Sequence, residues 1–227
     1  MTIRKLFHYL FINYIRASKM VELYQPTYNP SQYRYLVKDL PKRNCEDRVS
    51  FIDKSLNFSK IDSILDIGSL FGYFIFRLAQ THKIFGQGID LSSVYTAYSR
   101  AIADLNEIER VSFATMKLTA DNVHSLPKYD LIIFLNVFHH IVHFDGFASA
   151  DKIMKTLIKK CDYFVFETGQ YTEPGQYWTD SLEFMGENPD KWIASYLTKL
   201  GFRITATKEF PTHLNKVMRT VYVCQKQ

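Results

Sequence analysis

Three histidines stand close together in the stretch NVFHHIVHF, residues 136–144: His139, His140 and His143. On a helix, His139 and His143 would share one face at the spacing that lets two imidazoles bind one zinc ion. A third ligand would have to be Asp145 or the distant His213, and the H-E-x-x-H pattern is missing, so we predict no metal site. The remaining chemistry is that of an imidazole beside a reacting oxygen, as a general base or as a hydrogen-bond donor.

The turn D-I-G-S-L-F-G, residues 66–72, is the second chemical signal. Gly68 allows a tight turn from a strand into a helix, and about twenty residues later Asp90 is placed to accept the hydroxyls of a ribose. Asp66 would repel a pyrophosphate and attract an ammonium or sulfonium group, and Leu70 replaces the middle glycine of a dinucleotide turn. The turn therefore favours S-adenosylmethionine over a nicotinamide dinucleotide, the alternative being that both acids only form turns.

The alternation of strand and helix patterns predicts where both motifs lie in the fold. From residue 62 onward, short apolar runs alternate with amphipathic stretches, which is typical of a parallel sheet covered by helices. Strands are predicted at 63–68, 86–90, 111–116, 129–138 and 162–168, with 203–210 and 219–225 as a closing hairpin. Helices are predicted at 71–80, 92–108 with a serine cap, 147–160 and 189–202. Both signals follow strand ends, the edge where such sheets bind ligands.

Composition suits a single globular domain with an extension. The chain has 227 residues and 47% hydrophobic content, and residues 1–60 lack the alternation, so we expect an N-terminal extension or lid before a domain at 61–227. The net charge of +5 does not indicate a nucleic-acid binder, and three distant cysteines suit a reducing cytoplasm. The aromatic run at 6–15 has basic flanks. It predicts a helix docked on its own domain or, alternatively, peripheral contact of residues 3–19 with the inner membrane.

Over residues 62–227 these features resemble class I S-adenosylmethionine-dependent methyltransferases. The resemblance implies an α/β, Rossmann-like fold whose seven-stranded sheet has an antiparallel last strand and helices on both faces. It also implies S-adenosylmethionine as cofactor and S-adenosylhomocysteine as product. The expected cofactor-binding residues are Asp66, Gly68, Ser69, Gly72, Asp90, Leu91, Asn136, Val137 and Phe138.

Stretches outside this core are similar to the methyltransferase domains of bacterial kinase–methyltransferases that terminate O-antigen chains. They are LYQPTY (23–28), RNCEDR (43–48), NVFHHIVHFDG (136–146), the E-P and Y-W pairs near 173–178, EFPTHL and MRTVYV. That family methylates a phosphate placed on the terminal sugar of a glycan. Phosphate as the acceptor is thus implied by the resemblance and not by the residues alone.

The expected acceptor site combines catalytic and substrate-binding side chains. The catalytic candidates are His139, His140 and Tyr24, and the substrate-binding candidates are Gln25, Arg43, Arg48, His143, Tyr177 and His213. Structural alternatives stay open: the arginines on a solvated helix face, Tyr177 and Trp178 as loop anchors, and packed histidines. An ionised phosphate oxygen needs donors to hold it, whereas a sugar hydroxyl needs a base whose pKa lies near the working pH.

The expected function is O-methylation of a phosphate or hydroxyl oxygen on a sugar or glycan, in bacterial O-antigen, lipopolysaccharide or capsule synthesis. Methylation of an RNA terminal phosphate or of a small metabolite is the enzymatic alternative, and the RNA version requires a broad basic groove. A different class of alternative is a non-catalytic S-adenosylmethionine-binding partner of a glycan assembly complex. The sequence does not determine the oligomeric state.

Overall fold

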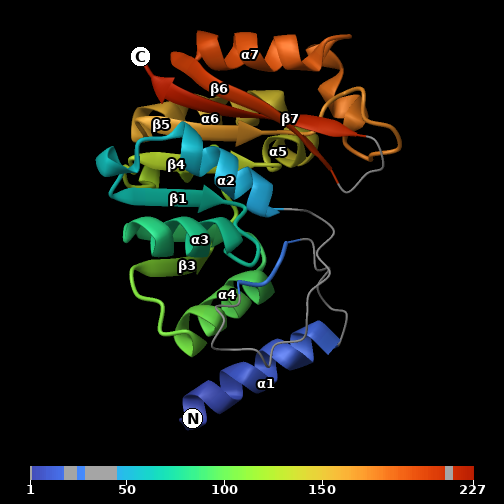
Figure 1. Ribbon diagram of the computed structural model, residues 1–227. Coiled ribbons are helices and arrows are strands. Elements are labelled where there is room, and N and C mark those ends of the chain that lie inside the picture. The colour runs from blue at the N-terminus through green and yellow to red at the C-terminus, as the bar shows by residue number, and fades with distance from the viewer. Residues whose placement is uncertain (1, 18–24, 29–44, 213–216) are drawn as a thin grey trace.

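The computed structural model describes residues 2–17, 25–28, 45–212 and 217–227. Seven strands form one sheet in the order β3-β2-β1-β4-β5-β7-β6 (Figure 1). They are β1 (Ser63–Ile67), β2 (Phe85–Asp90), β3 (Val111–Thr115), β4 (Leu131–Leu135), β5 (Tyr163–Glu167), β6 (Phe202–Pro211) and β7 (Met218–Lys226). The first five run parallel, and β7 runs antiparallel to β5 and β6. The predicted parallel sheet with a closing hairpin is confirmed.

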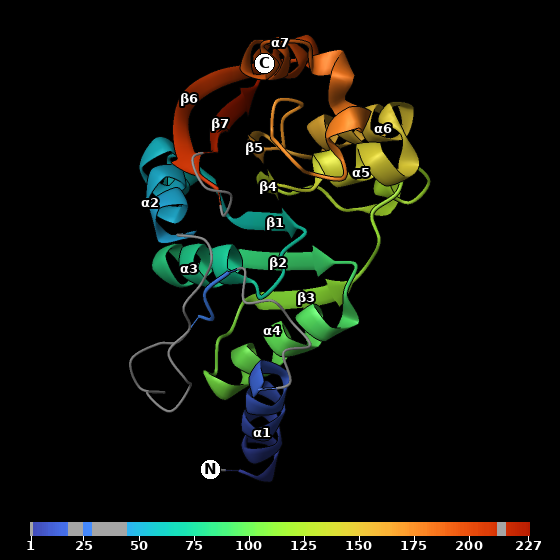
Figure 2. The same ribbon diagram turned by 90° about the vertical axis from the view of Figure 1, so that its right-hand side faces the viewer.

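Helices cover both faces of the sheet (Figure 2). They are α1 (Ile3–Ala17), α2 (Cys45–Ser55), α3 (Tyr73–His82), α4 (Ser93–Leu105), α5 (Phe138–Asp145), α6 (Phe147–Leu157) and α7 (Pro189–Lys199), with short helices η1 (Phe58–Lys60), η2 (Val123–Ser125), η3 (Ile158–Lys160) and η4 (Thr179–Met185). α2, α3 and α4 pack on the face of Ile64 and Ile133, and α5, α6 and α7 on the face of Leu65 and Ile132. Neighbouring strand residues point to opposite faces, so strands buried on both sides are apolar throughout.

One predicted strand has the wrong length. The apolar run at 129–138 is divided: β4 ends at Leu135, Asn136 takes a left-handed φ of +61°, and α5 begins at Phe138. The strand prediction is therefore wrong beyond Leu135. The run stays apolar because α5 buries Phe138 and Ile141, and a short apolar run does not distinguish a strand from a buried helix. The histidines consequently lie on a helix.

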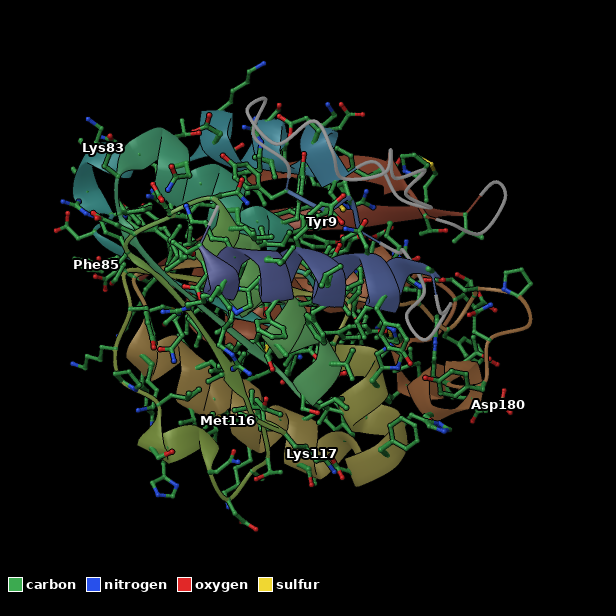
Figure 3. All side chains as sticks on the ribbon, turned by 90° about the horizontal axis from the view of Figure 1, so that it is seen from below. Tyr9, Lys83, Phe85, Met116, Lys117 and Asp180 are labelled. Atoms are coloured by element: carbon green, nitrogen blue, oxygen red, sulfur yellow. The ribbon has the colours of Figure 1, made fainter. Side chains whose placement is uncertain are left out.

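The helix α1 lies at the end of the molecule opposite α7, packed against α4 (Figure 1). Its Ile12 and Ile15 are buried, and Arg4 forms an ion pair with Asp104 of α4. The opposite face of α1 is apolar and exposed at Ile3, Phe7, Leu10 and Tyr14. In the view from below, α1 crosses the molecule and carries the labelled Tyr9 (Figure 3). Among the described segments, none of the helices has the length and apolarity to cross a membrane.

Candidate functional site

A cavity of about 620 Å³ opens at the carboxyl edge of the sheet. It lies where β1 and β4 are neighbours and the strand order reverses, the position at which doubly wound sheets bind ligands. Figure 3 shows Lys83 and Phe85, at the start of β2, on the opposite side of the molecule from Asp180 of η4. The cavity lining divides into a half near β1, β2 and β3 and a half near β4, β5 and β7. We refer to these as the cofactor half and the acceptor half.

The turn after β1 forms the floor of the cofactor half. Gly68 has a φ of +77°, and a Cβ atom there would lie 2.3 Å from Cγ2 of Val137, so only glycine fits. Leu70 has a left-handed φ of +47°, although it replaces the glycine of a dinucleotide turn. Its backbone N–H donates to Oδ2 of Asp90 at 3.0 Å. The turn therefore keeps its shape without the middle glycine and uses Asp90 as an anchor.

Two acidic side chains, Asp66 and Asp90, line the cofactor half. Asp66 is buried, and desolvation together with the nearby charge of Asp90 raises the Asp66 pKa to about 8. Oδ2 of Asp66 and Oε1 of Gln25 are buried acceptors without a hydrogen-bond partner in the described part of the chain, and both residues line the cavity. Burial also raises the pKa of Asp90, whose Oδ1 accepts from the Ser92 N–H at 2.8 Å. Unpartnered acceptors facing a cavity fit a cationic, hydroxyl-bearing ligand.

Most predicted cofactor residues line this cavity. Those on its surface are Asp66, Gly68, Asp90, Leu91, Asn136 and Val137. Ser69, Gly72 and Phe138 lie behind the surface: Gly72 is the N-cap of α3, and Phe138 packs on the ring of Phe166. For these three residues the structure shows a contribution to the turn and the core, and their assignment to the cofactor stays a prediction.

The three histidines of α5 have three different environments. His139 is buried, and its Nδ1 accepts the Gly169 N–H at 2.9 Å. His140 lies on the cavity wall with its Nδ1 2.9 Å from the hydroxyl of Tyr177, and burial together with the positive charge of Arg219 lowers its pKa to about 4. His143 lies outside the cavity lining, with its Nδ1 2.9 Å from Oγ of Ser181. His139 and His140 therefore both line the acceptor half of the cavity, whereas His143 does not.

Gly169 allows His139 to sit where it does. A Cβ atom at this position would lie 2.6 Å from the Trp178 ring and 3.0 Å from Cγ of His139. Trp178 is buried, with its ring centroid 4.5 Å from that of His139. The glycine thus lets the backbone after β5 approach both rings, and this close packing fixes the orientation of the imidazole.

Two buried ion pairs form the floor of the acceptor half. Arg48 of α2 binds Glu167 of β5 through Nε and Nη2, both at 3.0 Å, and both residues are at most 1% exposed. Arg219 of β7 binds Glu173 through Nε at 2.7 Å and Nη2 at 2.6 Å. Asn136 joins the pairs, because its Nδ2 donates to Glu167 at 3.1 Å and its Oδ1 accepts from Arg219. These contacts join five residues from four segments that are far apart in the sequence.

The predicted acceptor residues are only partly described. Gln25, Arg48, His139, His140 and Tyr177 line the cavity. Tyr24, Arg43 and His213 lie outside the described residues, so their assignments stay predictions. Arg48 does not lie on a solvated helix face, and its guanidinium is engaged by Glu167.

Sequence reasoning missed four residues of the acceptor half: Glu167, Gly169, Glu173 and Arg219. Two of them stand in stretches already noted for their resemblance, E-P at 173 and MRTVYV, and a buried polar residue in an apolar strand is a usable signal for Glu167. In the described chain, no three His, Cys, Asp or Glu side chains gather as a metal site.

No protein-family model matches the chain. Two curated sequences from Escherichia coli, both named O-antigen chain terminator bifunctional methyltransferase/kinase WbdD, are 26% identical to it over 216 residues. The alignment covers 91% of this chain and 28% of the relative, so the chain spans little more than a quarter of the curated relatives' length.

Solved structures agree on the fold. A structure of the bifunctional kinase–methyltransferase WbdD has a TM-score of 0.77 at 24% identity, covering 94% of this chain and 46% of that one. Magnesium protoporphyrin IX methyltransferase from Synechocystis PCC 6803 with bound S-adenosylmethionine has a TM-score of 0.63 at 15% identity, covering 100% of this chain and 99% of that one. The N-terminal domain of EvdMO1 with bound S-adenosylhomocysteine has a TM-score of 0.63 at 12% identity, covering 100% of this chain and 98% of that one.

The predicted fold class and the resemblance are confirmed by these comparisons. The superposition on methyltransferase structures covers 94% of the chain or more, and the sequence similarity to WbdD extends over 91% of it. The chain is thus a relative of the WbdD methyltransferase/kinase, built on the fold of S-adenosylmethionine-dependent methyltransferases.

Proposed function

We propose that the chain is an S-adenosylmethionine-dependent O-methyltransferase that acts on a phosphate oxygen of a sugar or glycan in bacterial surface-polysaccharide synthesis. The similarity to a protein named as an O-antigen chain terminator supports the glycan class. The choice of a phosphate oxygen as the acceptor rests on an observation in the acceptor half. Of the described histidines that line it, His140 has a pKa lowered to about 4, and His139 has its Nδ1 occupied by the Gly169 N–H.

The cofactor half fits S-adenosylmethionine. This cofactor supplies a methyl group on a positively charged sulfur, where an oxygen nucleophile can attack in line. Asp66 would hold its ammonium group, because Oδ2 is an unpartnered buried acceptor in the described chain. Asp90 would hold the ribose hydroxyls, since each of its oxygens accepts one backbone N–H and has a second lone pair.

The proton balance of methyl transfer separates the two acceptor types. One oxygen–carbon bond forms, the carbon–sulfur bond breaks, and the electron pair leaves with the sulfur, whose charge is cancelled. A phosphate oxygen is already negative, so no proton has to move. A sugar hydroxyl must lose its proton, and this requires a base with a pKa near the working pH.

The two histidines of the cavity wall are poorly suited to that task, for different reasons. His140 has a pKa of about 4, so its neutral ring binds a proton too weakly to take one from a hydroxyl near pH 7. Nδ1 of His139 accepts the Gly169 N–H, so its neutral form carries the proton on Nε2 and acts as a donor. Donors of this kind hold an anionic oxygen in place, and close positioning then supplies most of the rate.

The paired cations favour a single phosphate over an RNA end. The described cations that line the cavity each have a carboxylate partner: Arg48 with Glu167, Arg219 with Glu173, and Lys117 with Asp145. A triphosphate-ended RNA requires a broad basic groove to bind its several charges. One phosphate beside a positive sulfonium has a smaller charge to balance.

Release of S-adenosylhomocysteine tests the proposal. The purified chain is incubated with S-adenosylmethionine and, in separate reactions, phosphorylated sugars, the same sugars without phosphate, triphosphate-ended RNA and a panel of small metabolites. We expect turnover with phosphorylated sugars alone, with a rate that falls below about pH 6 as the phosphate takes up its second proton. Turnover with only unphosphorylated sugars would overturn the phosphate assignment. Tight cofactor binding without turnover on any acceptor would instead support the non-catalytic partner.

We also propose that α1 contacts an anionic membrane surface. Its exposed apolar stripe of Ile3, Phe7, Leu10 and Tyr14 lies away from α4, and the helix has no acidic residue. Cosedimentation with phosphatidylglycerol vesicles should fall for Phe7→Asp relative to the wild type. Equal sedimentation of both proteins, or sedimentation of neither, would rule this contact out.

A further inference from the structure

A cluster of aromatic rings forms one lip of the cavity. We call these rings the aromatic wall: His140, Phe144 and Tyr177 line the cavity, and His143 packs beside Phe144 and Tyr177 outside the lining. We infer that this wall is a stacking surface for a pyranose ring of the acceptor, with Tyr177 as its main platform. The inference rests on the proposed function, because it assigns a place to the sugar that carries the methylated oxygen.

Two rings of the aromatic wall are largely exposed to solvent. Tyr177 is 61% exposed and Phe144 67% exposed, although both line the cavity. Their rings lie 6.2 Å apart, and the His143 ring lies 5.1 Å from Tyr177 and 4.8 Å from Phe144. A contiguous exposed apolar patch beside a cavity is typical of a ligand contact.

Contacts with α5 hold the exposed Tyr177 side chain in place. The buried ring of Trp178 anchors this segment on α5, packed against His139 and with the Arg219 guanidinium 5.4 Å from its centroid. Tyr177 contacts the same helix, and its hydroxyl is 2.9 Å from Nδ1 of His140, with the two rings nearly parallel at an angle of 24°. Figure 2 shows the loop before η4 beside α5. The platform is therefore fixed before any ligand arrives, which reduces the entropic cost of binding.

Polar groups that match a sugar surround the rings. Gln176, Asp145 and Lys117 line the same cavity, and the Lys117 ammonium lies 2.9 Å from Oδ1 of Asp145. A pyranose has C–H groups on its faces and hydroxyls around its edge. An aromatic face with an amide and a carboxylate at its rim suits both surfaces of such a ring.

Two other flat ligands are less suited to this wall. A nucleobase of RNA would bring phosphates, and the described cations of the cavity are paired with carboxylates. The adenine of the cofactor belongs, by the resemblance, near Leu91, whereas Tyr177 contacts the acceptor-side His140. A neutral sugar ring requires no further cation.

The test measures saccharide and cofactor binding separately. Saturation-transfer NMR would follow methyl glycosides of mannose, glucose and galactose, and their trisaccharides, on the full chain saturated with S-adenosylhomocysteine. We expect at least one saccharide to bind, Tyr177→Ala to weaken it about tenfold or more, and Tyr177→Phe to keep most of the affinity because stacking remains. Tyr171→Ala is the matched control, since Tyr171 is an exposed tyrosine of the same loop outside the cavity lining. Calorimetry should give unchanged S-adenosylhomocysteine affinity for all three variants.

The outcomes separate this inference from the proposed function. Absence of saccharide binding by the wild type, or equal binding by wild type and Tyr177→Ala, overturns the sugar platform even if methyl transfer to some acceptor is observed. A parallel loss of S-adenosylhomocysteine affinity in Tyr177→Ala overturns it in favour of a cofactor contact. Saccharide binding that depends on Tyr177, without any S-adenosylhomocysteine release, supports the platform and counts against the methyltransferase. Thermal unfolding of each variant identifies any change caused by loss of the fold.

Discussion

The two halves of the cavity are built in different ways. The cofactor half depends on short segments, the turn at 66–72 and the end of β2, and on backbone N–H groups that bind Asp90. The acceptor half depends on side chains far apart in the sequence, such as Arg48 with Glu167 and Arg219 with Glu173. Local backbone geometry thus shapes the half that fits a widely used cofactor. Long-range charge pairs shape the half where we propose that the acceptor binds.

The largest effect is expected from breaking one of those pairs. Glu167→Gln leaves the Arg48 guanidinium buried without its carboxylate, and the loss of one partner of a buried pair costs about 3–5 kcal/mol of unfolding free energy. Urea denaturation measures this change. Glu183→Gln, the same substitution at an exposed position, should stay within about 0.5 kcal/mol. If Glu167→Gln cost no more than its control, the pair would not stabilise the acceptor half.

A second experiment compares one variant from each half of the cavity. Asp90→Ala removes the proposed acceptor of the ribose hydroxyls and should weaken S-adenosylhomocysteine binding by tenfold or more, since hydrogen bonds to charged groups contribute about 1.5–3 kcal/mol each. His139→Ala should lower turnover about tenfold or more with almost unchanged cofactor affinity, because it removes a donor from the acceptor half. Calorimetry and steady-state kinetics give both quantities. Asp121→Ala, an exposed acid, is the control.

Equal loss of affinity and turnover in both variants would contradict the division into halves. His139 is buried against Trp178, so the melting temperature of His139→Ala must be recorded as well. His139→Gln retains a side-chain N–H donor, and recovery of turnover in that variant would show that the imidazole acts by donating.

The cofactor half should also respond to pH. The pKa of Asp66 is about 8, and a bound ammonium group favours the ionised carboxylate, so cofactor affinity should rise with pH from 6 to 7.5 by up to about tenfold per unit. The folded pKa lies above the unfolded value of 3.8, so the stability that protonated Asp66 contributes to the ligand-free protein is fully present below pH 3.8 and is lost as pH rises through about 8. Calorimetry at several pH values measures the affinity. In Asp66→Asn the pH dependence of binding should disappear, and its persistence would assign it to another group.

The same contrast explains what the sequence could predict. The strand–helix alternation and the turn at Gly68 are local patterns, so the fold and most residues that line the cofactor half were predictable. The division of 129–138 into β4 and α5 was not, because a buried strand and a buried helix are both apolar. Asparagine adopts the left-handed conformation more readily than most residues, but a single Asn136 is too weak a signal to mark the turn between them. Arg219 and Glu173 were not predictable as partners, because 46 residues separate them and only the folded sheet brings them together.

The smallest effect is expected at Leu70, which stands where a dinucleotide-binding turn has its middle glycine. Leu70 has a φ of +47°, and this left-handed backbone costs a non-glycine residue about 1–2 kcal/mol. Leu70→Gly removes that strain but adds about 0.5–1 kcal/mol of unfolded-state entropy, so the net gain in unfolding free energy should lie between about 0 and 1.5 kcal/mol. Urea denaturation measures it, and calorimetry should show unchanged S-adenosylhomocysteine affinity, because the N–H that anchors Asp90 belongs to the backbone and not to the side chain. A large loss of affinity would mean that the leucine side chain itself contacts the cofactor, and that the cofactor half depends on more than backbone geometry.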